Sequence, residues 1–144
     1  MNAGLCDWPR SRKDLVIIVN DRELFKIAKE ASLHAYVPYS GFPIGAALEC
    51  EGGQIFTGCN IENAAYGDTI CAERVAIVKA VSEGYTKFTR IAIYGEGKGY
   101  CMPCGSCRQV MAEFSPEMEV LSSKAGGGYV SYPLKRLMPY TFNF

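Results

Sequence analysis

The sequence has no excess of either charge, because fifteen lysine and arginine residues balance fifteen aspartate and glutamate residues. A protein that holds duplex DNA or tRNA needs a surplus of positive charge against the phosphate backbone. We therefore expect no nucleic acid polymer among the partners of this chain.

Long hydrophobic runs are also missing. The longest apolar stretch near the start is LVIIV, residues 15–19. It is far below the roughly 18 residues that span a bilayer, and it is shorter than the apolar part of a secretory signal peptide. These absences predict a soluble, cytoplasmic protein with no membrane partner.

Cysteine, in contrast, is plentiful. The count is odd, and two of the residues form a C-x-x-C pair at Cys104 and Cys107. In a chain without an export signal, this pattern favours reduced thiols and a metal site over a disulfide framework. The seven cysteines stand at positions 6, 50, 59, 71, 101, 104 and 107.

A chain of 144 residues, 49% of them hydrophobic, fits one domain with a single core. We interpret residues 1–19 as an irregular leader and residues 20–144 as that domain.

Helical spacing starts after an N-cap at Asn20 or Asp21 and continues until Val37 and Pro38 stop it. Residues 51–53 predict a hairpin turn, and Gly84 is placed as the C-terminal cap of a helix that starts at Cys71. The other predicted elements are strands at 44–50, 54–60, 88–94, 119–122 and 129–132, and helices at 104–114 and 133–137. This alternation is typical of an α/β domain layered around a mixed sheet.

Two short segments carry a candidate metal site: CAE at residues 71–73 and PCGSC at residues 103–107. Both fall where the chain enters the first turn of a predicted helix. The free N–H groups and partial positive charge there stabilise thiolates, the form of cysteine that binds zinc at about 2.3 Å. The sequence thus predicts one zinc ion per chain, with Cys71, Cys104 and Cys107 as ligands.

Three protein ligands leave the fourth zinc position open for water, whereas a structural site is usually closed by a fourth cysteine or histidine. His34, the only histidine, lies in the pattern of the first helix. Glu73 stands two residues after Cys71, where its carboxylate can take a proton from zinc-bound water and pass it on. This spacing matches the pattern of zinc deaminases, so Glu73 is the predicted catalytic residue.

A structural explanation of the same residues stays open. Cys104 and Cys107 could be half of a zinc knuckle or buried thiols at a helix start, with Glu73 merely solvated. Pro103 and the correctly spaced CAE segment favour the catalytic interpretation.

Three thiolates give the zinc site a net negative charge, which weakens the metal as a Lewis acid. Arg74 follows Glu73, and Arg108 follows Cys107. Either guanidinium could donate to a ligand sulfur and withdraw charge. On spacing alone, a surface arginine on a helix fits each position equally well.

Taken together, four segments closely resemble the small cytidine deaminases whose zinc ligands are all cysteines. The likeness runs in order from about residue 21 to residue 142. It implies a three-layer α/β/α fold with a mixed five-stranded sheet. It also implies hydrolytic deamination of cytidine and 2′-deoxycytidine to uridine and 2′-deoxyuridine, with release of ammonia, in pyrimidine salvage. The segments are SGFPIGAAL at 40–48, GCNIENAAY at 58–66, CAER at 71–74 and PCGSCRQ at 103–109.

The resemblance implies that Asn60 and Glu62 hold the ribose hydroxyls and that Phe42 lies against the substrate. A carboxylate beside an amide can accept from and donate to a sugar diol. Without the family likeness, Asn60 would be an ordinary turn amide and Phe42 a packing residue. The full substrate-binding set that the resemblance implies is Phe42, Asn60, Glu62, Ala64, Tyr66 and Phe142.

Members of this family are typically homotetramers whose sites borrow residues from neighbouring subunits. LMPYTF at residues 137–142 resembles the family's closing L-x-P-x-x-F. We therefore expect a homotetramer with shared active sites, in which Phe142 completes the site of another subunit. Met102, Val75 and Asp68 depart from residues common in the family, and these departures bear on substrate breadth.

Two other functions stay open at this point. One is an enzyme of the same fold that acts on blasticidin S, a nucleotide or an RNA base. The other is a non-enzymatic zinc-stabilised binding module, which would need neither Glu73 nor an open zinc position. The Asn60-x-Glu62 pair and the zero net charge favour a small free nucleoside.

Overall fold

The computed structural model describes residues 19–144. Nearly all of the expected leader, residues 1–18, lies outside the described residues. None of the helices in the described part of the chain is both long and apolar enough to cross a membrane. The elements are, in order, α1 Asp21–Ser32, β1 Ile44–Cys50, β2 Ile55–Cys59, η1 Tyr66–Asp68, α2 Ala72–Ser82, β3 Phe88–Gly95, α3 Gly105–Phe114, β4 Glu119–Ser123, β5 Tyr129–Pro133 and α4 Leu134–Leu137.

Helix α1 begins where the sequence predicts. The Asn20 side chain accepts a hydrogen bond from the Glu23 backbone N–H, and the Glu23 carboxylate accepts one from the Asn20 backbone N–H. This reciprocal pair satisfies two of the N–H groups that a helix start leaves free.

The end of α1 was predicted wrongly, because the helix stops at Ser32 and not at Val37 and Pro38. The backbone of Tyr36 finds other partners: its N–H donates to the Asn60 carbonyl at 3.0 Å, and its carbonyl accepts from the Glu62 N–H at 2.8 Å. His34 therefore lies after the helix, exposed, and not within it.

The five strands form one mixed sheet in the order β2-β1-β3-β4-β5. Strand β1 is antiparallel to β2 and β3, β3 is parallel to β4, and β4 is antiparallel to β5. Two glycines with positive φ, Gly52 and Gly53, make the turn of the predicted hairpin. The expected mixed five-stranded sheet is confirmed.

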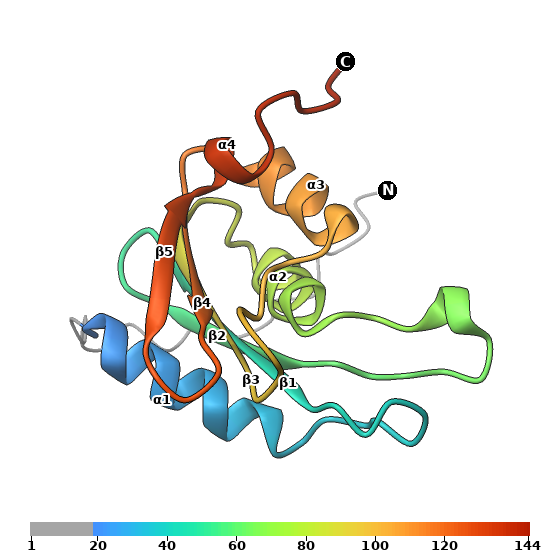
Figure 1. Ribbon diagram of the computed structural model, residues 1–144. Coiled ribbons are helices and arrows are strands. Elements are labelled where there is room, and N and C mark those ends of the chain that lie inside the picture. The colour runs from blue at the N-terminus through green and yellow to red at the C-terminus, as the bar shows by residue number, and fades with distance from the viewer. Residues whose placement is uncertain (1–18) are drawn as a thin grey trace, which may run out of the picture.

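Helices cover both faces of the sheet (Figure 1). On one face, Ala47, Ala92 and Leu121 of the strands pack with Leu24 and Ala28 of α1. The alternate strand residues point to the other face, where they form the larger core with α2, α3 and α4. The strand residues of this larger core are Ala46, Leu48, Cys50, Phe56, Phe88, Ile91, Ile93 and Val120. The three-layer α/β/α arrangement follows from this alternation.

Two glycines bring the helices close to the sheet. A Cβ atom on Gly45 of β1 would lie 1.9 Å from the Ala28 carbonyl oxygen of α1. A Cβ atom on Gly58 of β2 would lie 2.2 Å from the Ala72 carbonyl oxygen, in the first turn of α2. Only glycine allows these contacts, and Gly58 thereby sets the position of the helix start that follows Cys71.

Candidate active site

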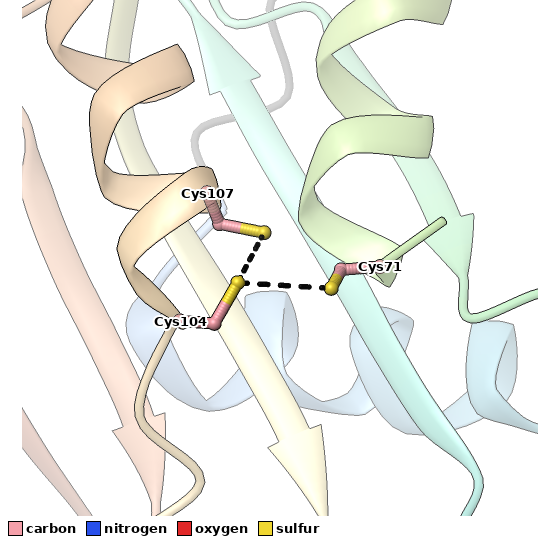
Figure 2. Close-up of side chains that lie close together, drawn as sticks. All are labelled: Cys71, Cys104 and Cys107. Carbon is pink, nitrogen blue, oxygen red and sulfur yellow. Dashed lines mark hydrogen bonds between the residues drawn. The ribbon is translucent and has the colours of Figure 1, made fainter. Parts of the chain in front are cut away.

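The three predicted ligand cysteines meet at the starts of two helices (Figure 2). Cys71 is the N-cap of α2, Cys104 is the N-cap of α3, and Cys107 lies in the first turn of α3. The Sγ atom of Cys104 is 3.8 Å from that of Cys71 and 3.5 Å from that of Cys107. All three sulfurs lie within 4.8 Å of one another.

These sulfurs fit a zinc ion. Thiolates bound at about 2.3 Å in a tetrahedron lie about 3.8 Å apart, close to the two separations above. Among residues 19–144, this is the only group of three or more histidine, cysteine, aspartate or glutamate side chains with ligand atoms so close together. Cys107 is buried, Cys71 is half-buried and Cys104 is exposed, so the cluster lies at the edge of the core.

The surroundings favour ionised sulfur at Cys71. The neighbouring Cys107 thiol and the Arg74 guanidinium hold the pKa of Cys71 well below its usual range, although burial acts in the opposite direction. The Cys71 sulfur and burial both raise the pKa of Cys107. Of these two thiols, Cys71 therefore loses its proton first.

Glu73 is buried beside the cysteines, with 4% of its surface exposed. Burial raises the pKa of its carboxyl to about 7, and the charge of Cys71 acts in the same direction. Glu73 lies in the first turn of α2, and its carboxylate in turn contributes to the raised pKa values of Cys101 and Cys107. A buried carboxyl in this position can hold and release a proton next to the sulfur cluster.

The structure separates the two candidate arginines. The Arg74 Nη2 atom lies 3.7 Å from the Cys71 sulfur and 3.3 Å from the Thr69 carbonyl oxygen. Arg108 donates instead to two backbone carbonyls, those of Pro103 at 2.9 Å and Leu137 at 2.8 Å. Arg74 thus contacts a candidate ligand sulfur, while Arg108 ties the start of α3 to the end of α4.

Asn60 has backbone partners on both sides of its amide. Its Oδ1 atom accepts from the Ile44 N–H at 2.8 Å, and its Nδ2 atom donates to the Phe42 carbonyl at 2.9 Å. The residue is 8% exposed. Asn60 therefore fixes the start of β1, a structural contribution that spacing alone did not predict.

Glu62 is bonded to the same loop. Its Oε2 atom accepts from the Tyr39 N–H at 2.9 Å and from the Ser40 N–H at 3.1 Å. The Ser40 hydroxyl and these two N–H groups together lower the pKa of Glu62, although desolvation acts in the opposite direction. The structure thus brings Asn60, Glu62 and Phe42 together around the loop at residues 37–43.

Phe42 is half-buried and lines a pocket of about 430 Å³. Cys101 and Met102, which precede the PCGSC segment, also line this pocket. The edge of the Phe42 ring lies over Gly97, where an added Cβ atom would be 2.9 Å from its Cζ atom. One predicted substrate residue therefore faces a cavity beside the segment that leads to Cys104.

The other three predicted substrate residues are exposed in this single chain. Ala64 and Tyr66 lie between β2 and α2, and Tyr66 in η1 is 91% exposed. Phe142 is 68% exposed; its carbonyl accepts from Gln109 and its ring packs edge-on against Phe144. Among the described residues, no hydrogen bond or aromatic contact joins these three side chains to the cysteine cluster.

Reasoning from the sequence gave Ser40 no role, although it stands in the SGFPIGAAL segment. In the structure its Oγ atom accepts a hydrogen bond from the Phe42 N–H at 3.0 Å. A serine two residues before that donor, with glycine between them, is a common turn signal. The signal was present in the sequence, but the link to Glu62 depends on tertiary contact.

Comparison with known proteins gives consistent matches over most of the chain. The family model described as the cytidine and deoxycytidylate deaminase zinc-binding region matches residues 18–122, a range that contains the three clustered cysteines. A cytidine deaminase of Sporosarcina psychrophila is 46% identical over 122 residues, which cover 84% of this chain and 90% of that protein. A probable cytidine deaminase of Dictyostelium discoideum is 43% identical over 129 residues, 87% of each chain.

A solved structure agrees with these matches. The crystal structure of a cytidine deaminase from Burkholderia pseudomallei superimposes with a TM-score of 0.83 at 42% sequence identity. The match covers 86% of this chain and 100% of the other. The likeness therefore extends to the whole of that fold.

Proposed function

Since the chain belongs to the cytidine deaminase family and is a hydrolytic deaminase, we propose that it converts cytidine and 2′-deoxycytidine to uridine and 2′-deoxyuridine. Water adds its oxygen to C4 of the base, the bond from C4 to the amino nitrogen breaks, and ammonia leaves. The observation that carries the proposal is the meeting of three sulfurs from two helix starts next to the buried Glu73.

Cys71, Cys104 and Cys107 would hold one zinc ion per chain. When bound, zinc supplies Lewis acidity that lowers the pKa of water. Support comes from two of the sulfur separations, 3.8 Å and 3.5 Å, which are close to the spacing of tetrahedral thiolate ligands, and from the two helix N-termini that stabilise thiolates. Arg74 would offset part of the negative charge of the three thiolates, because its guanidinium lies against the Cys71 sulfur.

Glu73 would carry the proton. Its carboxylate accepts one proton from the attacking water and delivers it to the ring nitrogen beside C4. It then accepts the remaining proton of the added hydroxyl group and delivers it to the departing amino group, so that C4 becomes a carbonyl and ammonia leaves. Its burial supports this role, because a carboxyl shielded from bulk water exchanges its proton with the bound reactants.

Glu62 and Asn60 would bind the sugar while keeping their bonds to the loop. Glu62 uses its Oε2 atom for the two backbone N–H groups, so its Oε1 atom remains available to accept from a ribose hydroxyl. The Asn60 Nδ2 atom carries two hydrogens; one is donated to the Phe42 carbonyl, and the other would donate to a ribose hydroxyl. Phe42, at the wall of the neighbouring pocket, would face the base.

The exposed residues support a shared site. Ala64, Tyr66 and Phe142 would reach substrate bound in neighbouring subunits of a homotetramer, which accounts for their exposure in the single chain. We also propose a cytoplasmic location and a role in pyrimidine salvage. The ligand role of three cysteines fits the reducing conditions of the cytoplasm.

The test is the loss of ultraviolet absorbance when the purified protein is mixed with cytidine, compared with Glu73→Gln. Glutamine has nearly the shape of glutamate, so this variant should keep its fold and its zinc. It should lose deamination by about two to four orders of magnitude, the usual contribution of general acid–base catalysis. Wild-type turnover by Glu73→Gln would refute the role of Glu73, and an inactive wild-type protein with full zinc would refute the proposed substrate.

A further inference from the structure

Apart from the half-buried ring of Phe42, the loop at residues 37–43 is held mainly by hydrogen bonds. Tyr39 is 63% exposed, and Ser40, Gly41 and Pro43 are also exposed, so little apolar packing fixes this segment. The Gly41 N–H donates to the Val37 carbonyl at 3.0 Å. A loop with so few buried contacts depends on its polar contacts for a single conformation.

Ser40 stands at the junction of these hydrogen bonds. Its backbone N–H donates to the Glu62 carboxylate at 3.1 Å, and its hydroxyl oxygen accepts from the Phe42 N–H at 3.0 Å. Gly41, between them, has a φ of +64°, which turns the chain so that the Phe42 N–H faces the serine oxygen. Ser40 thus bonds to Glu62 on one side and to Phe42 on the other.

The other face of the loop is fixed independently. Asn60 holds the Phe42 carbonyl and the Ile44 N–H, and the bridge between Tyr36 and Ile61 joins the two segments further out. Figure 1 shows the stretches from α1 to β1 and from β2 to α2 extending beyond the sheet on the same side. Among residues 19–144, the Phe42 N–H has only the Ser40 hydroxyl oxygen as its hydrogen-bond partner.

We propose that Ser40 is a positioning residue for nucleoside binding, which links the Glu62 carboxylate to the backbone of Phe42. This inference rests on the proposed function, in which Glu62 binds the sugar and Phe42 faces the base. A nucleoside contacts both groups at once, so its affinity depends on their relative position. Ser40 touches neither part of the substrate and acts through these two neighbours.

The test uses Ser40→Ala, Ser40→Thr and the matched control Ser131→Ala. Ser131 also lies beside a glutamate, since its hydroxyl donates to Glu119 at 2.8 Å, but it is on β5 at the far edge of the sheet. Threonine keeps the hydroxyl, and because Ser40 is exposed there is room for its methyl group. Each protein is assayed for cytidine turnover, zinc content, melting temperature and, by calorimetry, the Kd of uridine, the product that it binds without converting.

Ser40→Ala should raise the KM for cytidine and the Kd for uridine roughly three- to tenfold, the effect of one hydrogen bond, while kcat stays within about twofold. Ser40→Thr should restore most of the affinity, and Ser131→Ala should match the wild type. The double variant Ser40→Ala with Glu62→Gln should raise the uridine Kd by a smaller factor than the product of the two single-variant factors. The reason is that both residues belong to one hydrogen-bond network.

Three results would overturn the inference: an unchanged uridine Kd in Ser40→Ala, no rescue by Ser40→Thr, or losses that multiply fully in the double variant. Each leaves the proposed function intact if the wild-type protein deaminates cytidine. A wild-type protein that neither deaminates cytidine nor binds uridine would instead refute the proposed function itself.

Discussion

Replacing Asn60 by alanine should weaken both the fold and nucleoside binding. Asn60 is 8% exposed, and its amide bonds to the Ile44 N–H at 2.8 Å and to the Phe42 carbonyl at 2.9 Å. Asn60→Ala removes both partners and leaves one backbone donor and one backbone acceptor to find new ones at the start of β1.

The expected loss of stability follows from these two bonds. Each bond contributes about 1 kcal/mol net, and a buried group left without a partner costs more, so the variant should lose about 2–3 kcal/mol. A change of 1 kcal/mol shifts the melting temperature by roughly 3–5 °C at this chain length, which predicts a drop of roughly 6–15 °C. Asn60→Asp should lose less stability than Asn60→Ala, because its carboxylate still accepts a hydrogen bond from the Ile44 N–H. It should still be less stable than the wild type, because the carboxylate also faces the Phe42 carbonyl oxygen.

The assay is thermal unfolding at equal protein concentration, paired with uridine binding, since ligand and subunit concentrations also change the melting temperature. Gln54→Ala serves as the control, because that amide is exposed in the hairpin and should change stability by less than about 0.5 kcal/mol. An unchanged melting temperature in Asn60→Ala, together with lost uridine binding, would refute the reasoning. It would mean that Asn60 contacts the sugar without holding the loop.

Three further predictions concern the cysteine cluster, the helix contact of Gly58 and the carboxylate of Glu62, which we propose binds the sugar. Cys104→Ala should lose zinc and melt at a lower temperature, because thiolate ligation and folding are coupled. The control Cys101→Ala should keep its zinc, because the Cys101 thiol lies outside the cluster. Equal zinc content in the two variants would contradict the ligand assignment. Gly58→Ala should cost about 3 kcal/mol in urea unfolding, because its Cβ atom would overlap the start of α2; an unchanged midpoint would show that the helix can move away. Glu62 should titrate by NMR below its ordinary pKa of 4.5. Its contribution to stability is therefore complete above the unfolded pKa and is lost as the pH falls through the lower folded pKa, and a midpoint at or above 4.5 would contradict the loop contacts.

Local sequence signals set most of the element boundaries. The capping pair of Asn20 and Glu23 starts α1, and Gly84, with a φ of +91°, follows α2 as predicted. These signals act over a few residues, which is why they can be recognised without a structure. The end of α1 cannot be recognised in this way, because the backbone of Tyr36 bonds to Asn60 and Glu62, which are more than twenty residues away in the sequence.

Residue types and spacing in two short segments are enough to predict the chemistry proposed for the site. Cys104 and Cys107 lie within one helical turn, and Glu73 follows Cys71 by two residues, so each pair is close in any structure that forms the two helices. The likeness of these segments to the cytidine deaminases is enough to identify the family from the sequence.

How these two pairs come together depends on tertiary packing, which spacing along the chain does not reveal. Cys71 meets Cys104 because α2 and α3 pack on the same face of the sheet, and Gly58 lets α2 approach closely enough. The packing also places Arg74, and not Arg108, against a candidate ligand sulfur, although each arginine directly follows a residue of its motif in the sequence. It gives Asn60 and Ser40 their contacts with the loop of Phe42, because hydrogen bonds between distant segments depend on where the strands end and not on spacing along the chain.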